Sequence, residues 1–464
     1  MKNMYVKHQA LIFLVVLLSN FYTFAQQLTG NLPQLPNQAI SLYGYKNFER
    51  YLIDSTQTNA KGEFTLRFTA KNYGVAVLNS KGLQANILLL APENIAVQLV
   101  DDAEVTILKI TQGKQNLLLQ QYILEQPKRQ QALSAWDFLQ QLYATDSLFI
   151  TDTPSFLAIQ QAKQSLQAQE STFLQNLPAN SLLSWYIPMR NLIGSVGQVA
   201  QQRTHEIPTT LAALRQINYA DERLYKSGVL NQAIENHIWF IENSSGPLDS
   251  VFVDLNRSID IIIKQLKDDK EKFNLVSKYL FEVLEKRSLY TASEYLAKRL
   301  LDSEDCGCLN PEFEKQLHKY GKMAKGATVP DIVFTKFSNF PEGIPIKTMR
   351  ELNADYYLVI FAAGWCGHCQ EEMPKLKEFY PTLKGKKIEV VLVSLDEHQV
   401  SFSQFTKSLP FISTTDLQKW NGKAATDYQV YGTPSYFMLN KDLQILQKIK
   451  DVNHLKTWVD WFVP

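Results

Sequence analysis

The pattern of apolar and polar residues changes twice along the chain, and the first region has the pattern of short strands. In Glu63–Phe68 every second residue is apolar, and this segment follows a turn signal at Asn59–Gly62. Alternation of this kind predicts a strand with one buried face. Further short apolar runs follow at close spacing, which favours a small β-sandwich. We therefore expect a β-sandwich-like domain of unknown function at residues 26–110.

The second region, residues 111–309, has apolar residues at helical spacing. The apolar residues of Phe273–Leu284 fall on one face of a helix. Similar patterns, with prolines between them, predict an α-helical middle domain of roughly six to eight helices. The polar stretch at residues 310–325 is interpreted as a linker.

The third region, residues 326–464, has an α/β pattern. Leu358–Ala362 and Ile388–Leu395 are nearly continuous apolar runs, which are typical of central parallel strands buried on both faces. A helical pattern follows each run and another closes the chain, at Gln370–Leu383, Gln399–Ser408 and Asn453–Phe462. The sequence therefore predicts a multi-domain protein that ends in an α/β domain.

The first residues have the composition of an export signal. Lys2 and Lys7 precede an apolar run at residues 10–18, and small or polar residues lead to Ala25. This order is typical of a secretory signal peptide, which we expect at residues 1–25. An uncleaved N-terminal anchor has a similar pattern, but the run is short for a membrane span. We expect an exported protein in the periplasm or cell envelope of a bacterium.

Composition limits the classes of partner. The chain has 464 residues, with 47 Lys and Arg against 46 Asp and Glu. Because positive and negative residues are nearly equal in number, the charge gives no reason to expect nucleic acid or an anionic membrane surface as a partner. The sequence leaves the oligomeric state open.

All four cysteines lie late in the chain as two close pairs, Cys306 with Cys308 and Cys366 with Cys369. A disulfide-stapled scaffold would distribute more cysteines along a shorter chain. Two tight pairs favour redox or metal chemistry instead. A zinc site at Cys366 and Cys369 would need two more ligands, which Cys306 and Cys308 could supply. The position of Cys366 between a buried strand and a helix favours redox chemistry, so we expect no metal.

The second pair has the spacing that thiol–disulfide exchange needs. Cys366 follows a buried strand and opens a helix, whose unpaired N–H groups and dipole favour the thiolate that attacks disulfides. The two-residue spacer places Cys369 one turn along, close enough to attack a mixed disulfide at Cys366. We therefore interpret Cys366 as the nucleophile and Cys369 as the resolving thiol. His368 adds partial positive charge beside the thiolate and favours a less negative reduction potential.

These residues resemble a known family. Phe361–Cys369, which includes Trp365 and Gly367, resembles the active site of the thioredoxin superfamily, and its Cys-Gly-His-Cys motif is similar to that of protein disulfide isomerases. The wider sequence resembles the TlpA/ResA-like exported thioredoxins at Gly326–Phe334, Cys369–Pro374 and Tyr431–Pro434. More weakly, the N-terminal part is similar to β-rich domains of unknown function that precede such thioredoxins in exported bacterial proteins.

The resemblance implies roles for single residues. Pro434 is expected to form a cis peptide bond and to pack against the disulfide. Thr433 would offer backbone groups to an extended substrate segment, which then adds like a strand. Trp365 would shield and present Cys366. Glu372 aligns with an acidic residue that is implied in proton handling, although a helix-surface carboxylate is an equal interpretation.

One position departs from the family pattern. Thioredoxins bury an Asp six residues before the first active-site Cys, and this chain has Ile360 there. The usual proton acceptor for Cys369 is therefore absent, so Glu372 or water must replace it, or exchange is slower.

The resemblance implies a thioredoxin fold at residues 326–464 and the activity of a thiol–disulfide oxidoreductase. Such an enzyme needs no cofactor and contributes to cell redox homeostasis. Its partners would be protein thiols or disulfides and a redox partner in the membrane or periplasm. The ResA-like sequence implies a reductase, for example in cytochrome maturation, whereas the Gly-His spacer implies an oxidant or isomerase. The direction of electron flow therefore stays open.

Other interpretations concern the enzyme class, the first cysteine pair and the N-terminal region. A peroxiredoxin would need Pro and Thr where this chain has Val359 and Ala363. A disulfide between Cys306 and Cys308 would close a strained ring, and this pair could relay electrons with Cys366 and Cys369. Alternatively, Cys306 and Cys308 form a plain disulfide or remain free thiols. Finally, the first 300 or so residues could form an envelope binding or scaffold module for a partner or glycan, with the thioredoxin domain as an accessory.

Overall fold

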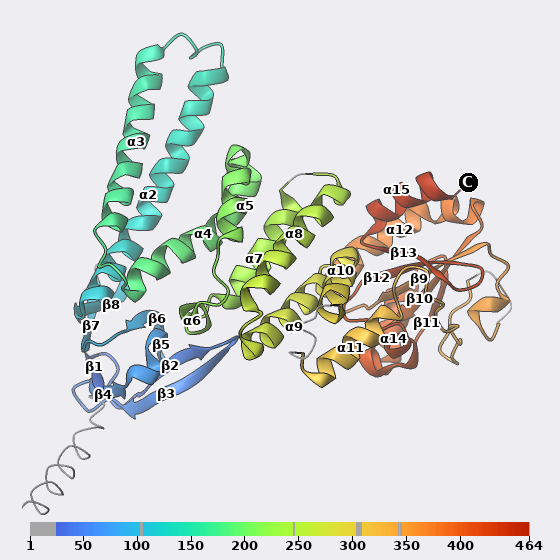
Figure 1. Ribbon diagram of the computed structural model, residues 1–464, viewed down its shortest axis with the longest axis horizontal. Coiled ribbons are helices and arrows are strands. Elements are labelled where there is room, and N and C mark those ends of the chain that lie inside the picture. Colours follow the sequence, from blue (N-terminus) through green and yellow to red (C-terminus); the bar gives the residue numbers. More distant parts are fainter. Residues whose placement is uncertain are drawn as a thin grey trace, which may run out of the picture. The chain divides into compact units, whose positions relative to one another are not determined.

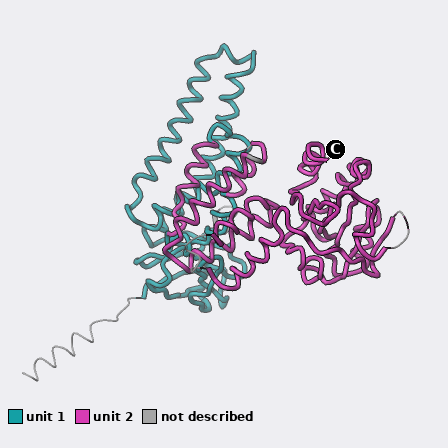
Figure 2. Tube along the Cα trace, turned by 45° about the vertical axis from the view of Figure 1, so that its right-hand side comes forward, with its two compact units in different colours: residues 1–206, 221–237 teal, residues 207–220, 238–464 magenta. Residues whose placement is uncertain are grey.

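The computed structural model, shown in Figure 1, divides into two compact units, which Figure 2 colours separately. Unit 1 comprises Met1–Glu206 and Asp221–His237, and unit 2 comprises Ile207–Ala220 and Ile238–Pro464. The residues that the structure describes are 25–102, 105–244, 246–302, 309–341, 343 and 346–463. Residues 1–24 of the expected signal peptide, and both Cys306 and Cys308, lie outside them. No helix within the described residues is long and apolar enough to cross a membrane.

Unit 1 begins with two four-stranded sheets, which confirms the β-rich N-terminal region. The first has the order β4-β1-β7-β8 and is formed by Glu63–Phe68, Gln26–Asn31, Ile95–Asp102 and Val105–Gln112. The second has the order β3-β2-β5-β6 and is formed by Glu49–Gln57, Ala39–Lys46, Gly74–Ser80 and Leu83–Leu90. Both sheets contribute side chains to one buried hydrophobic cluster, for example Leu66 from the first sheet and Leu42 from the second. The description of this region as a sandwich stays a prediction.

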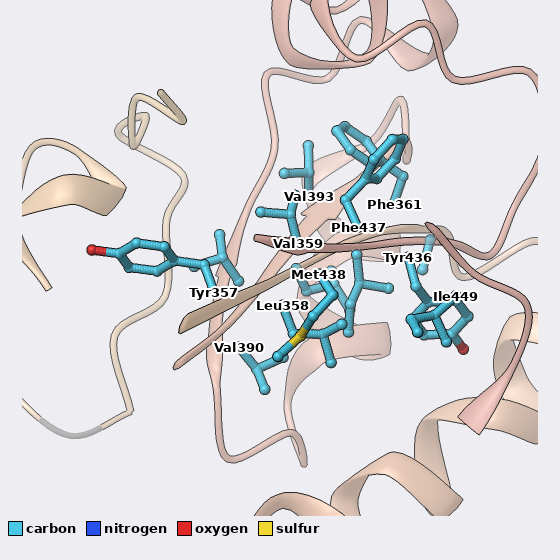
Figure 3. Packing of buried hydrophobic residues seen from close by; sticks show 14 of the residues in the cluster. Tyr357, Leu358, Val359, Phe361, Val390, Val393, Tyr436, Phe437, Met438 and Ile449 are labelled. Carbon is cyan, nitrogen blue, oxygen red and sulfur yellow. The ribbon is translucent and has the colours of Figure 1, made fainter. Parts of the chain in front are cut away.

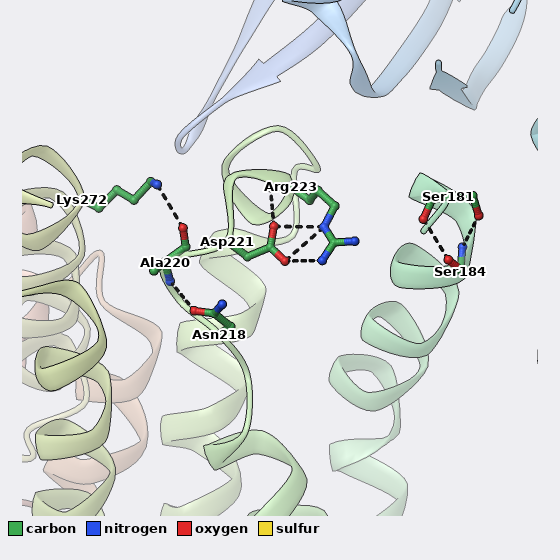
Figure 4. Close-up of polar contacts among 7 residues, drawn as sticks. All are labelled: Ser181, Ser184, Asn218, Ala220, Asp221, Arg223 and Lys272. Atoms are coloured by element: carbon green, nitrogen blue, oxygen red, sulfur yellow. Dashed lines mark hydrogen bonds and ion pairs between the residues drawn. The ribbon is translucent and has the colours of Figure 1, made fainter. Parts of the chain in front are cut away.

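The helices of unit 1 follow directly after the strands. They are α2 (Lys114–Thr145), α3 (Thr153–Gln175), α4 (Leu182–Gln202), α6 (Glu222–Tyr225) and most of α7 (Leu230–Asn243). Short polar side chains cap the starts of α4 and α6, as Figure 4 shows: the Ser184 N–H donates to Ser181 Oγ at 3.0 Å, and the Arg223 N–H donates to Asp221 Oδ1 at 2.9 Å. Such caps satisfy N–H groups that the helix itself cannot pair.

Unit 2 contains the remaining helices of the middle region, so the predicted helical middle is confirmed. They are α5 (Ile207–Arg215), α8 (Leu248–Leu266), α9 (Lys270–Lys286) and α10 (Tyr290–Leu301). The next helix, α11 (Pro311–Gly321), lies within the stretch interpreted as a linker. On α9 the predicted apolar face, from Phe273 to Leu284, is buried. The loop after α5 is tied to α9, because the Lys272 ammonium donates to the Ala220 carbonyl at 3.0 Å (Figure 4).

The C-terminal part of unit 2 is the predicted α/β domain. Its five-stranded sheet has the order β11-β10-β9-β12-β13 and is formed by Ile412–Thr414, Ile388–Ser394, Tyr356–Ala362, Ser435–Asn440 and Ile445–Ile449. The first three strands are parallel, and the last two pair antiparallel. The helices are α12 (Gly367–Gly385), α13 (Gln399–Thr406), α14 (Lys423–Asp427) and α15 (Val452–Phe462). The apolar runs of β9 and β10 are buried in the core, as Figure 3 shows.

A buried charged cluster joins the helices of unit 2 to this sheet. The Lys448 ammonium on β13 lies 3.2 Å from Glu294 Oε1 on α10 and 4.1 Å from the ring centre of Tyr320 on α11. The Tyr320 hydroxyl donates to Glu285 Oε1 on α9 at 2.5 Å. Burial raises the pKa of the Glu285 carboxyl, and the charge of Lys448 lowers it in part. Lys448 is therefore the cation that offsets buried negative charge at this junction.

Replacing Lys448 tests this cluster. Lys448→Met keeps the apolar stem but leaves Glu285 and Glu294 without their cation, so we expect the free energy of unfolding to fall by about 3 kcal/mol. Urea denaturation followed by circular dichroism measures it. The matched control is Lys423→Met, whose exposed ion pair with Asp427 on α14 should contribute about 1 kcal/mol or less. Equal losses in the two variants would contradict the role given to Lys448.

Candidate active site

The turn from β9 into α12 places Cys366 at the start of the helix, as its sequence position predicts. Cys366 is the N-cap residue, with extended backbone angles (φ −91°, ψ 110°), and its sulfur accepts from the Cys369 N–H at 3.2 Å. The sulfur therefore pairs with an N–H group that the first turn of the helix leaves free. Gly367 is the first helical residue, and a Cβ on it would meet open space, so no steric requirement for glycine exists there.

The two active-site cysteines are both free thiols but differ in access. Cys366 is 9% exposed and Cys369 is 0% exposed. Burial raises the pKa of the Cys369 thiol well above its usual range, and its contact with Cys366 raises it further. Cys369 therefore stays protonated at neutral pH, and Cys366 is the thiol that a substrate in solvent can reach.

The loop before β12 brings two further predicted residues to the thiols. The Thr433–Pro434 peptide bond is cis. The Cys366 thiol donates to the Thr433 carbonyl at 3.4 Å, although 67 positions separate these residues. The structure thus brings together Cys366, Cys369, Thr433 and Pro434, which the sequence analysis selected from two distant segments.

Trp365 and His368 lie on the outer side of the site. Trp365 is half-exposed, and its indole N–H donates to the Leu395 carbonyl at 3.4 Å. His368 is exposed, and its Nδ1 lies 3.5 Å from the Glu371 carboxylate. Any positive charge on His368 is therefore partly offset by its neighbour on the helix.

Asp396 is a site residue that sequence reasoning missed. It is 1% exposed, and both of its carboxylate oxygens accept from the Gly364 N–H, at 3.2 and 3.1 Å. The Ser394 hydroxyl donates to the same carboxylate at 2.7 Å. Asp396 therefore fixes the turn that carries Trp365 and Cys366. Its position directly after the apolar run of β10 was the available signal, because loops at the carboxyl ends of parallel strands form sites.

Glu372 is buried, so its interpretation as a helix-surface carboxylate is wrong. It is 3% exposed, its Oε2 accepts from the Val452 N–H at 2.7 Å, and Lys375 donates to its Oε1 at 2.7 Å. The residue became buried because α15 packs against α12. Its hydrogen bond to Val452 spans 80 positions of the sequence, which helical periodicity cannot reveal.

Tyr436 is a second residue that sequence reasoning missed. On β12 it pairs with Ile360, the residue that replaces the family's buried Asp. Its hydroxyl is buried and has no hydrogen-bond partner among the described residues. Burial raises the pKa of Tyr436, and the negative charge of Glu372 raises it further. The Tyr436, Glu372 and Cys369 side chains are all buried.

Within the described residues, no group of three or more His, Cys, Asp or Glu side chains is arranged to hold a metal ion. The proposed relay between Cys306/Cys308 and Cys366/Cys369 falls outside the described residues.

Comparison with known proteins finds sequence similarity in the C-terminal region of the chain. Residues 353–445 match the family model described as thioredoxin-like. The thiol-disulfide oxidoreductase ResA of Bacillus cereus is 28% identical over 138 residues, which cover 30% of this chain and 76% of ResA. ResA of Bacillus thuringiensis subsp. konkukian is 29% identical over 28% of this chain and 73% of its own. A thioredoxin-like protein from Bacteroides caccae with a solved crystal structure is 18% identical, with a TM-score of 0.37, over 55% of this chain and 93% of its own.

The difference between the two thiols predicts the order of alkylation. When the reduced chain reacts with iodoacetamide at pH 7.5, Cys366 should be modified at least about tenfold faster than Cys369, because Cys369 is buried and protonated. Raising the pH to 9 should leave the modification of Cys369 slow, because its raised pKa keeps it a thiol. Peptide mass spectrometry of timed samples measures both rates. Faster modification of Cys369 would contradict the geometry.

Proposed function

We propose that this chain, whose C-terminal region is a thioredoxin-like domain with ResA-like thiol-disulfide oxidoreductase relatives, exchanges thiols and disulfides with other proteins in a bacterial cell envelope. The observation that carries the proposal is the position of Cys366. It is a free thiol at the N-terminus of α12, in contact with both the Cys369 N–H and the Thr433 carbonyl. The envelope location rests on the export signal expected at residues 1–25.

The exchange proceeds in two steps. The Cys366 thiolate attacks one sulfur of a substrate disulfide, so that the substrate S–S bond breaks, a mixed disulfide forms and the other substrate sulfur leaves as a thiolate. The Cys369 thiolate then attacks the Cys366 sulfur, which releases the second substrate sulfur. Two electrons have passed from the Cys366/Cys369 pair to the substrate, and the pair is oxidised to a disulfide. The reverse sequence oxidises a substrate dithiol.

The second step requires a base, because Cys369 is protonated at neutral pH. We assign this role to Glu372, whose buried carboxylate shares a region with the Tyr436 hydroxyl and the Cys369 thiol. The Lys375 ammonium lies 2.7 Å from the Glu372 carboxylate. A buried carboxylate on α12 thereby replaces the Asp that Ile360 displaces from β9. The proton moves from the Cys369 sulfur to Glu372, directly or through the Tyr436 hydroxyl.

Thr433 is proposed to bind the substrate chain. It is half-buried, whereas Pro434 beside it is buried. An extended substrate segment that pairs with its backbone would place the substrate disulfide over Cys366, since the Thr433 carbonyl already contacts that sulfur. The half-exposed Trp365 would then cover the opposite side of the same sulfur.

Two serine variants test the roles of the thiols. Cys366→Ser should lower the rate of reduction of a disulfide-bonded peptide by at least about a hundredfold, since a hydroxyl does not ionise at neutral pH. Cys369→Ser should accumulate a mixed disulfide at Cys366, visible as a mass increase equal to the peptide. The double variant Cys306→Ser/Cys308→Ser is the control and should retain the exchange. Full activity of Cys366→Ser would overturn the proposed function.

The reduction potential tests the contribution of the spacer and the direction of electron flow. In glutathione buffers we expect the Cys366/Cys369 pair to have a potential less negative than about −270 mV, the value of thioredoxin. His368→Pro, which creates the Gly-Pro spacer, should shift it by about 30 mV towards more negative values, a tenfold change in the equilibrium constant. A wild-type value at about −270 mV would favour a reductase, and one nearer about −180 mV an oxidant or isomerase. The absence of any shift in His368→Pro would contradict the effect assigned to His368.

A further inference from the structure

The loop that carries Thr433 is enclosed by the helices of unit 2. We call residues 431–435 the cis-proline loop. The ring of Tyr431 lies edge-on to Phe281 of α9, with ring centres 6.0 Å apart, and 6.4 Å from Tyr320 of α11. A Cβ on Gly432 would lie 3.5 Å from the Cα of Lys286, at the end of α9. The helices therefore form one side of the environment of this loop.

Two hydroxyl groups from the start of α10 and the turn before it reach the loop directly. The Tyr290 hydroxyl donates to Ser435 Oγ at 2.8 Å, and the Ser435 hydroxyl donates in turn to the Gly432 carbonyl at 2.8 Å. The Ser288 hydroxyl lies 3.5 Å from the Pro434 carbonyl and 3.3 Å from the Tyr290 hydroxyl. Tyr290 and Ser435 are both buried, so water cannot replace the bond between them without a rearrangement.

The turn that presents these groups has a constrained backbone. Ser288 has a φ of +55°, in the left-handed region that residues with a Cβ rarely adopt. The Ser288 N–H donates to the Glu285 carbonyl at 3.0 Å and the Leu289 N–H to the Leu284 carbonyl at 2.9 Å, which closes the end of α9. The position of the Tyr290 hydroxyl is thus fixed by the end of one helix and the start of the next.

A continuous series of contacts leads from α10 to the reactive sulfur. The Tyr290 hydroxyl donates to Ser435, and the Ser435 hydroxyl donates to the Gly432 carbonyl. The carbonyl of Thr433, which directly follows Gly432, accepts from the Cys366 thiol. We propose that Tyr290 is a positioning residue of the thiol–disulfide site, which acts through Ser435 to set the Thr433 backbone against Cys366. The proposal rests on the proposed function and extends the site into the helical region.

The proposal distinguishes two kinds of substrate. A peptide disulfide must pair with the Thr433 backbone while it reacts with Cys366, and a displacement of that backbone by less than an ångström misaligns the two sulfurs. A small disulfide such as 5,5′-dithiobis(2-nitrobenzoate) needs only the Cys366 thiolate. Loss of the Tyr290 hydroxyl should therefore slow the first reaction much more than the second.

The experiment compares Tyr290→Phe with Tyr295→Phe in the full chain. Tyr295 also lies on α10, and its hydroxyl donates to Asp260 Oδ2 at 2.8 Å, away from the cis-proline loop. Stopped-flow rates of the reduced proteins with a disulfide-bonded peptide and with the small disulfide are measured. We expect Tyr290→Phe to lose about tenfold with the peptide and less than about twofold with the small disulfide. Tyr295→Phe should change neither rate.

A double variant locates the effect at one hydrogen bond. If Tyr290 acts through Ser435, Tyr290→Phe combined with Ser435→Ala should react with the peptide no more slowly than Ser435→Ala alone. Additive losses, equal losses with both substrates, or the same losses in Tyr295→Phe would overturn the inference while leaving the proposed function intact. If the wild-type chain reduces neither substrate, the proposed function itself fails and the inference fails with it.

Discussion

The site depends on one constraint, which is that a fully buried strand must end where a helix begins. The residues from Leu358 to Ala362 are completely buried in the middle of the sheet, so both faces of β9 must be covered and its position is fixed. The chain leaves this strand through a short turn that Asp396 holds at Gly364. Cys366 then caps α12, and its sulfur accepts a hydrogen bond from the Cys369 N–H. Sheet burial thereby determines where the Cys366 sulfur meets the unpaired N–H groups of a helix.

Buried polar groups around the sheet supply what the apolar core cannot. Glu372, Asp396 and Glu285 are each buried, and each has hydrogen bonds that offset the cost of removing a carboxylate from water. The first two lie on elements that position the thiols, whereas the third lies on α9 beside Lys448. The Tyr436 hydroxyl is the exception, since it has no hydrogen-bond partner among the described residues.

Local patterns predicted much of this arrangement. The strand at Leu358–Ala362, the helix after it and the helix at the C-terminus are present within a few residues of their predicted bounds, because their periodicity reflects burial directly. The helix-capping position of Cys366 followed from the same pattern. The positions of Asp396, Tyr436 and Tyr290 in the structure did not follow from local patterns, since each contacts residues that are distant in the sequence. For Tyr290 that residue is Ser435, 145 positions away.

The helical region of unit 2 makes buried polar contacts with the α/β domain. Composition separates it from the α/β domain at a polar stretch, residues 310–325, but α8 to α11 belong to the same compact unit as the sheet. Lys448 of β13 faces Glu294 of α10, and Ser435 of β12 accepts from Tyr290. Buried polar contacts of this kind are costly to break, because each partner would be left unsatisfied. The helices that surround the cis-proline loop are therefore part of the structure that sets its position, and a thioredoxin-like domain separated from them would lose groups that its own sequence does not supply.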